Sequence, residues 1–165
     1  MQNIYPCLWF DGNAEEAANF YTSIFKNSKI GSISRYGKDA SKASGQPLGS
    51  AMVVMFQING QDFMALNGGP QFKFTEAVSF VVNCETQEEV DHYWEKLSAG
   101  GKIHRCGWLY DKFGLAWQIV PTALAKLLSD PDPGKTNRVM QALLQMDKLN
   151  IAALRKAYDG PSASQ

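Results

Sequence analysis

The chain has 165 residues, of which 45% are hydrophobic and 19% charged, a composition typical of one soluble globular domain. Lys and Arg together number 16, as do Asp and Glu, so the formal net charge is zero and neither nucleic acid nor an acidic membrane is expected as a partner. No apolar run reaches membrane-spanning length, and the N-terminal segment has no signal-peptide pattern. The three cysteines lack paired spacing, which predicts reduced thiols in a cytoplasmic protein.

Strand-like and helix-like patterns alternate through the first half of the chain. A helix is expected after Asn13, which can cap it, because acidic residues follow and apolar residues then recur at helical spacing. Asn59-Gly60 predicts a hairpin turn between two strands. Residues 37–49, rich in Gly, Ser and Lys, are predicted to form a mobile loop. Strands are expected at residues 4–10, 30–36, 51–58 and 61–66.

The second half begins the same order of elements again. Thr86 can cap a helix with two acidic residues in its first turn, and a pair of glycines can end it. Asp111 is expected to cap the turn that leads to Gly114. The last strand is apolar except for Gln118, whose amide needs hydrogen-bonding partners if it is buried. Strands are expected at residues 77–82, within 102–110 and at 115–120.

These two halves predict an internal repeat. NAEEAANFYTSI at 13–24 aligns with TQEEVDHYWEKL at 86–97, an offset of 73 residues (86 minus 13). In the closing hairpins, Gly60 aligns with Gly114 and Phe63 with Trp117, an offset of 54 residues (114 minus 60). The segment 37–49, which the second half lacks, accounts for the difference. The alternative is that any two amphipathic helices opening with Glu-Glu look alike.

The C-terminal segment follows a different pattern. Residues 121–128 predict a short helix, Asp132-Pro133 opens a second helix, and Asn150 can cap a third. Their apolar stripes need a surface to cover, on this chain's own sheet or on a partner chain's. The expected organisation is a domain of two modules over residues 1–121, about 1–70 and 74–121, with a helical extension at 122–160.

Several motifs in order resemble one protein family: WFDGNAEEAANFY at 9–21, NGG at 67–69, FKF at 72–74 and CGWLYDKFGLAWQIVP at 106–121. The chain is similar to the PhnB-like family, often labelled demethylubiquinone 3-methyltransferase, of the vicinal oxygen chelate (glyoxalase/bleomycin resistance) superfamily. The resemblance implies an α+β fold in which tandem βαβββ modules form curled mixed sheets around a cavity, with helices added at the C-terminus. It covers essentially the whole chain.

In metal-using members of the superfamily, the first and last strand of each module supply one ligand each, commonly His or Glu. Carried over by the motif spacing and the two offsets, these positions fall on Ile4, Met64, Ala77 and Gln118. Two aliphatic residues, a thioether and an amide do not suit a hard or borderline divalent ion. Neither His92 nor His104 has a second ligand at metal spacing, so we expect no metal and no other cofactor.

Strand alternation sorts the residues that would line the cavity. If Gln118 faces the cavity, its neighbours Trp117 and Ile119 face the core. If Ala77 faces the cavity, so do Ser79 and Val81, while Val78, Phe80 and Val82 pack under the helices. The result is an apolar hollow with few polar groups, typical of a small-molecule site. The residues predicted to bind a ligand are Gln118, Ser79, Asn67, Met64, Cys106 and Trp108.

Each polar candidate has a structural alternative. Ser79 can be a small residue that fits, and the NGG of 67–69 can be only a turn, or a nest of N–H groups for an anion. Cys106 can be an inert buried thiol, because no His or Lys is predictably beside it.

Two functions remain open from the sequence. The first is a metal-free protein that binds a small organic molecule, as a homodimer, with Gln118 as polar anchor. The second is an enzyme of unidentified reaction, for which Tyr110 and Asp111 near the cavity rim are the available acid–base groups. Methyl transfer is disfavoured, because no Gly-rich strand-to-helix turn of a nucleotide site is present.

Overall fold

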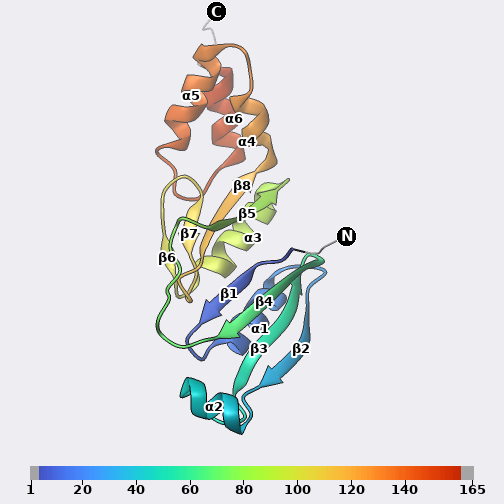
Figure 1. The fold of residues 1–165 in the computed structure, drawn as a ribbon. Helices are drawn as coiled ribbons and strands as arrows, with labels where there is room; N and C mark the ends of the chain where they lie inside the picture. Colours follow the sequence, from blue (N-terminus) through green and yellow to red (C-terminus); the bar gives the residue numbers. More distant parts are fainter. Residues whose placement is uncertain (1–3, 161–165) are drawn as a thin grey trace, which may run out of the picture. The chain divides into compact units, whose positions relative to one another are not determined.

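The computed structural model describes residues 4–160, and these form two compact units that divide between Phe74 and Thr75. Each unit contains a four-stranded mixed sheet with a helix after its first strand, and the second unit also carries the C-terminal helices (Figure 1). Among residues 4–160, no helix is long and apolar enough to cross a membrane.

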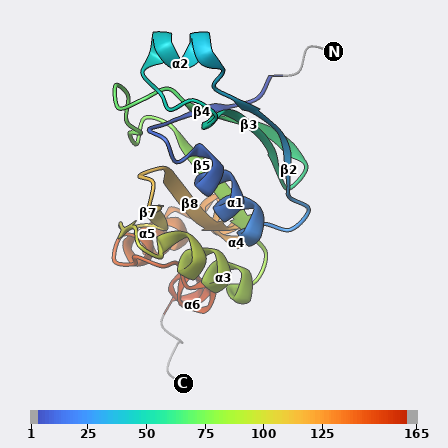
Figure 2. The ribbon, with the colours of Figure 1, turned by 90° about the horizontal axis from the view of Figure 1, so that it is seen from below.

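In the first unit the strands lie in the order β1-β4-β3-β2. Strand β1 runs parallel to β4, and the other pairs are antiparallel. Helix α1 packs against β3 and β4 through a buried face that includes Ala17 and Tyr21 (Figure 2). The elements are β1 Cys7–Phe10, α1 Ala14–Ile24, β2 Lys29–Arg35, α2 Lys38–Ser44, β3 Ala51–Ile58 and β4 Gln61–Asn67.

The second unit repeats this plan, with strands in the order β5-β8-β7-β6 and the same strand directions. Helix α3 packs against this sheet through Val90, Trp94 and Leu97. The identical order of strands confirms the internal repeat. The elements are β5 Ser79–Cys84, α3 Gln87–Ser98, β6 Lys102–Ile103, β7 Trp108–Tyr110 and β8 Ala116–Pro121.

The first strands of the two units are offset by 74 residues, one more than their helices. Cys7 pairs with Met64 in the first sheet, and Val81 pairs with Gln118 in the second (81 minus 7 gives 74). The extra residue arises because three residues connect β1 to α1, whereas two connect β5 to α3. The single offset of 73 predicted for both elements is therefore wrong for the strand.

Three local expectations also need correction. Ile4 and Ala77 were predicted as strand residues facing a cavity, but both are exposed and precede the strands, which begin at Cys7 and Ser79. Val78 was expected under the helices and is 65% exposed. The segment 37–49 is not simply a loop, since it contains the short helix α2.

The alternation predicted for β8, and for Val81 and Val82 in β5, is confirmed. In β8, Trp117 and Ile119 are buried, while Gln118 between them is half-buried. In β5, Val82 is buried and Val81 exposed. The second sheet therefore has a face covered by α3 and an open face that carries Gln118.

The C-terminal helices form their own apolar cluster beside β8 (Figure 1). Asp132 and Asn150 cap the second and third helices as predicted, accepting hydrogen bonds from Gly134 N and Ala153 N. The helices are α4 Thr122–Leu128, α5 Pro133–Leu143 and α6 Ile151–Asp159, and the buried cluster contains Leu124, Val139, Leu143, Leu149 and Leu154. Part of the surface that they cover belongs to this chain, because Val120 of β8 packs against the cluster.

Candidate functional site

Gln118 lies in the middle of the open face of the second sheet. Its nearest cross-strand neighbours are Val81 on β5 and Trp108 on β7. The amide Nε2 of Gln118 donates a hydrogen bond of 2.9 Å to Ser79 Oγ. This hydrogen bond gives the half-buried amide of Gln118 the partner that it requires. Three predicted residues, Gln118, Ser79 and Trp108, are thus brought together.

Ala116 is a small residue between two polar groups on the same face. Across it, Ser79 on β5 and Tyr110 on β7 occupy the neighbouring register positions. The open face therefore combines an amide, two hydroxyl groups and an indole around a small floor residue. Such a surface can hydrogen-bond and stack on a small organic molecule.

Tyr110 belongs to a cluster of titratable groups at the edge of this face. Its hydroxyl donates a hydrogen bond of 2.5 Å to Glu76 Oε1. The ring of His104 stands edge-on to the Tyr110 ring, with centroids 5.6 Å apart. The hydrogen bond from Tyr110 lowers the pKa of Glu76, and the same bond raises the pKa of Tyr110. At neutral pH Glu76 is thus a carboxylate and Tyr110 a protonated phenol.

Asp111, the other rim residue considered from the sequence, is buried and has a structural role. Its Oδ1 accepts hydrogen bonds from the backbone N–H groups of Phe113 and Leu115, at 2.9 and 3.1 Å. Its Oδ2 accepts a bond of 2.8 Å from Trp117 Nε1. The prediction that Asp111 caps the turn to Gly114 is confirmed, and Asp111 lies in the core, away from the open face.

Asn67, a predicted ligand-binding residue, lies in the first unit with its amide inside the core. Its Oδ1 accepts from Ala14 N at 2.9 Å, at the start of α1, and its Nδ2 donates to Ala51 O at 2.9 Å. These bonds join a helix and two strands, which is a structural role. A ligand-binding role for Asn67 stays a prediction that these contacts do not support.

The glycines after Asn67 do not form an open anion nest. The N–H groups of Gly68 and Gly69 both donate to Phe10 O, and the indole of Trp9 covers the turn. Trp9 Nε1 also donates to Gly69 O at 2.8 Å. The turn reading of this motif is the one that the geometry supports.

Met64 lies on the open face of the first sheet, between Cys7 on β1 and Met55 on β3. In the second sheet, Gln118 lies beside Val81 at the corresponding position. Around Met64 the donors are a thiol and two thioethers, and at Gln118 the donor is an amide, so neither position has a carboxylate or an imidazole. These donors do not fit a divalent ion such as Mg²⁺ or Mn²⁺, which prefers oxygen ligands. Among residues 4–160, no group of three or more His, Cys, Asp or Glu is arranged to hold a metal ion.

Cys106 is directed toward the C-terminal helices. It packs against their apolar cluster, and its Sγ donates a long hydrogen bond of 3.6 Å to Leu143 O. Its backbone has a φ of +60°, and its N–H donates to Met146 O at 2.7 Å. These contacts favour the inert-thiol reading over ligand binding.

The family follows from the sequence comparison. A model of the family described as 3-demethylubiquinone-9 3-methyltransferase matches residues 2–120. The chain belongs to this family. A putative 3-demethylubiquinone-9 3-methyltransferase, PhnB protein, from Bacillus cereus is 40% identical, and its structure superposes with a TM-score of 0.66 over 73% of this chain and 100% of its own. No curated protein matches the chain.

More distant structures share only the fold. A protein from Pseudomonas aeruginosa is 20% identical, with a TM-score of 0.59 over 73% of this chain and 98% of its own. The fosfomycin resistance protein FosX from Listeria monocytogenes, determined with Mn(II) and sulfate, is 17% identical, with a TM-score of 0.52 over 77% and 94% of the two chains. The fold expected from the sequence, with tandem βαβββ modules and added C-terminal helices, is confirmed for this PhnB-like family member.

Sequence reasoning missed one polar residue that belongs with the site. Glu76 precedes β5 and lies outside any predicted strand, so strand alternation could not predict which side of the sheet its side chain would lie on. Tyr110 was named only as a residue near the rim. Tyr110 could have been assigned to the same face as Trp108, because the two residues are two positions apart in β7.

Proposed function

We propose that this PhnB-like protein binds a small organic molecule on the open face of the second sheet, without a divalent metal ion. The observation that carries the proposal is the hydrogen bond from Gln118 to Ser79. Gln118 itself lies between Val81 on one neighbouring strand and Trp108 on the other. A half-buried amide held by a neighbour presents a fixed polar anchor, and the side chains beside it supply apolar contact.

The anchor can be tested with Gln118→Leu, which keeps the side chain's size but removes its polar atoms. A thermal-shift screen with quinones, phosphonates, aromatic antibiotics and S-adenosylmethionine is expected to identify a stabilising ligand. Gln118→Leu should weaken its binding about tenfold or more, because a fixed hydrogen bond to the ligand is lost. The control Gln141→Leu changes an exposed amide on α5 and should leave the affinity unchanged. Equal affinity in both variants would refute the anchor.

The metal-free part of the proposal has its own test. Equilibrium dialysis against Mn²⁺ or Zn²⁺, followed by elemental analysis, should show no stoichiometric ion retained by the protein. The reason is that neither Met64 nor Gln118, each taken with its cross-strand neighbours, offers a carboxylate or an imidazole. One tightly held ion per chain would overturn this part and leave the Gln118 test in place.

A second candidate function is an enzyme that uses Tyr110. The bond from its hydroxyl to Glu76, on the same face as Gln118, favours this candidate because it fixes a proton-bearing group beside the proposed ligand. If a compound from the screen is converted, Tyr110→Phe should abolish turnover and spare binding. Turnover retained in Tyr110→Phe would reject this role. Saturable stabilisation by S-adenosylmethionine would instead support the methyl transfer that the family description names.

We propose further that the protein is a homodimer. Its formal net charge of zero gives no long-range repulsion between copies, and Val78, Val81 and Ile103 expose apolar side chains in the second unit. Sedimentation equilibrium should return twice the chain mass of 18.3 kDa. A monomer at all concentrations tested would reject the dimer without bearing on the Gln118 anchor.

A further inference from the structure

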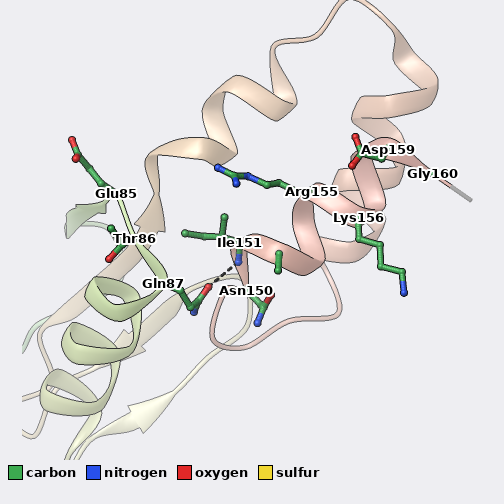
Figure 3. A pocket seen from close by; sticks show the side chains of 10 residues that line it. Glu85, Thr86, Gln87, Asn150, Ile151, Arg155, Lys156, Asp159 and Gly160 are labelled. Atoms are coloured by element: carbon green, nitrogen blue, oxygen red, sulfur yellow. Dashed lines mark hydrogen bonds between the residues drawn. The ribbon is translucent and has the colours of Figure 1, made fainter. Parts of the chain in front are cut away.

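A hollow lies in the second unit, between the start of α3 and helix α6 (Figure 3). Its volume is about 750 Å³, a size that accommodates small organic molecules. Its lining comes from residues 85–87 and from residues between 150 and 160. None of these residues belongs to the open face that carries Gln118, so this hollow is separate from the site proposed above.

The two walls of this hollow are tied together by the side chain of Gln87. Its Nε2 donates to Leu149 O at 3.1 Å, and its Oε1 accepts from Ile151 N at 2.8 Å. An ion pair of 2.7 Å between Lys148 Nζ and Asp91 Oδ1 adds a second link between the same segments. These bonds hold α3 and the start of α6 together, so the walls of the hollow are fixed relative to each other.

Arg155 is the charged side chain that extends across this hollow toward the start of α3 (Figure 3). In the same view the carboxylate of Glu85 and the ammonium of Lys156 point away from Arg155, whereas Asp159, one turn further along α6, lines the hollow on the same side of the helix. No ion pair or hydrogen bond joins the Arg155 side chain to another residue of the described range 4–160. An unpaired guanidinium presents several N–H donors to a carboxylate or phosphate group.

The helix ends contribute little to anion binding here. In the first turn of α6, the N–H groups of Ile151 and Ala153 already donate to the side chains of Gln87 and Asn150. The surroundings of Arg155 are instead partly apolar, because Ile151 and Ala152 lie four and three residues before it on the same helix face. A ligand that is complementary to this hollow carries an anionic group for the guanidinium and an apolar part for the neighbouring side chains.

We propose that this hollow binds a small organic anion, a carboxylate or a phosphate ester with an apolar group, through Arg155. The site goes beyond the proposed function, because α6 lies outside residues 2–120, which match the family. The anionic group pairs with the Arg155 guanidinium, and the apolar part rests on Ile151 and Ala152. Binding here also bridges α3 and the C-terminal helices.

The probes for this site are phenyl phosphate, benzoate, inorganic phosphate and the neutral benzyl alcohol. Two-dimensional ¹H–¹⁵N NMR should show saturable shifts at Gln87, Ile151 and Ala152 with phenyl phosphate and benzoate, and none with benzyl alcohol. Inorganic phosphate should bind more weakly than phenyl phosphate, because it lacks the apolar part. Equal shifts with benzyl alcohol would overturn the anionic requirement, and equal affinity for inorganic phosphate would overturn the apolar one.

Arg155→Gln should weaken phenyl phosphate binding about tenfold, the loss expected for one charge-assisted pair. Lys156→Gln removes the same charge from a side chain that points away and should change affinity much less. Unchanged affinity in Arg155→Gln, or no saturable shift in the unmodified protein, refutes the proposal. Gln118→Leu should leave phenyl phosphate binding intact, so failure at one site is distinguishable from failure at the other.

Discussion

At the scale of single residues, the close contact between Trp9 and Gly68 leaves no room for a side chain at position 68. A Cβ at position 68 would lie 2.1 Å from Trp9 Cζ2, and the indole is held by its bond to Gly69 O. Gly68→Ala should therefore destabilise the protein by about 1–3 kcal/mol through overpacking. Urea denaturation measures the change. Gly37→Ala is the control, because a Cβ there meets nothing within 4 Å; an equal loss in both variants would contradict the explanation.

The cysteines give a prediction about pH. Burial raises the pKa of Cys84 to about 12, with a smaller contribution from the charge of Glu89. An unfolded thiol has a pKa of about 8.5, so the stability linked to Cys84 is complete below that pH and is lost as pH rises toward about 12. Urea denaturation at rising alkaline pH should show a steeper loss in the parent than in Cys84→Ala.

Thiol reactivity checks the same environments independently. Cys7 is exposed, whereas Cys84 is buried. A disulfide reagent at neutral pH should label Cys7 first, and Cys84 only after unfolding. Labelling of both at equal rates in the folded protein would mean that Cys84 is not protected.

At the scale of elements, caps formed by neighbouring residues were predictable and caps formed over long range were not. Thr86, Asp132 and Asn150 cap their helices as their sequence positions suggest. Asn13 makes no side-chain cap; instead Asn67 Oδ1 accepts from the N–H of Ala14, the first residue of α1, which lies 53 residues before Asn67. Nothing in the local sequence around residue 13 carries that information.

Gln87 gives the element-scale prediction, because one amide joins α3 to α6. Gln87→Ala removes its bonds to Leu149 O and Ile151 N, both at a helix entrance. Loss of these bonds should raise hydrogen exchange across α6 and cost about 1–3 kcal/mol. Lys96→Ala, at the far end of α3, is the control. Unchanged exchange in α6 would show that the apolar cluster alone holds the helix.

At the scale of the whole molecule, the repeat made much of the fold predictable. The repeated order of elements anticipated two sheets of the same topology, and alternation placed Gln118 and Ser79 on one face, where the structure also places the predicted candidate Trp108. The contacts that could not be predicted from the sequence were those between residues that only folding brings together. Glu76 meets Tyr110 across 34 residues, and Arg155 faces a wall built from residues 85–87.

The C-terminal helices supply the final prediction, because they complete the second unit. Cys106 N and Gly107 N donate to Met146 O and Asp147 O, at 2.7 and 2.8 Å, and Val120 packs on the helical cluster. A chain ending at Pro121 loses these bonds and exposes Val120. We expect its second unit to melt at a lower temperature and its first unit to be unaffected.

Two of the four indole N–H groups can report on the units separately by NMR during heating. Trp117 Nε1, bonded to Asp111, belongs to the second unit, and Trp9 Nε1, bonded to Gly69, belongs to the first. In the shortened chain, the Trp117 signal should disappear at a lower temperature than in the full chain, while the Trp9 signal keeps its transition. An unchanged Trp117 transition would show that the C-terminal helices do not stabilise the second sheet.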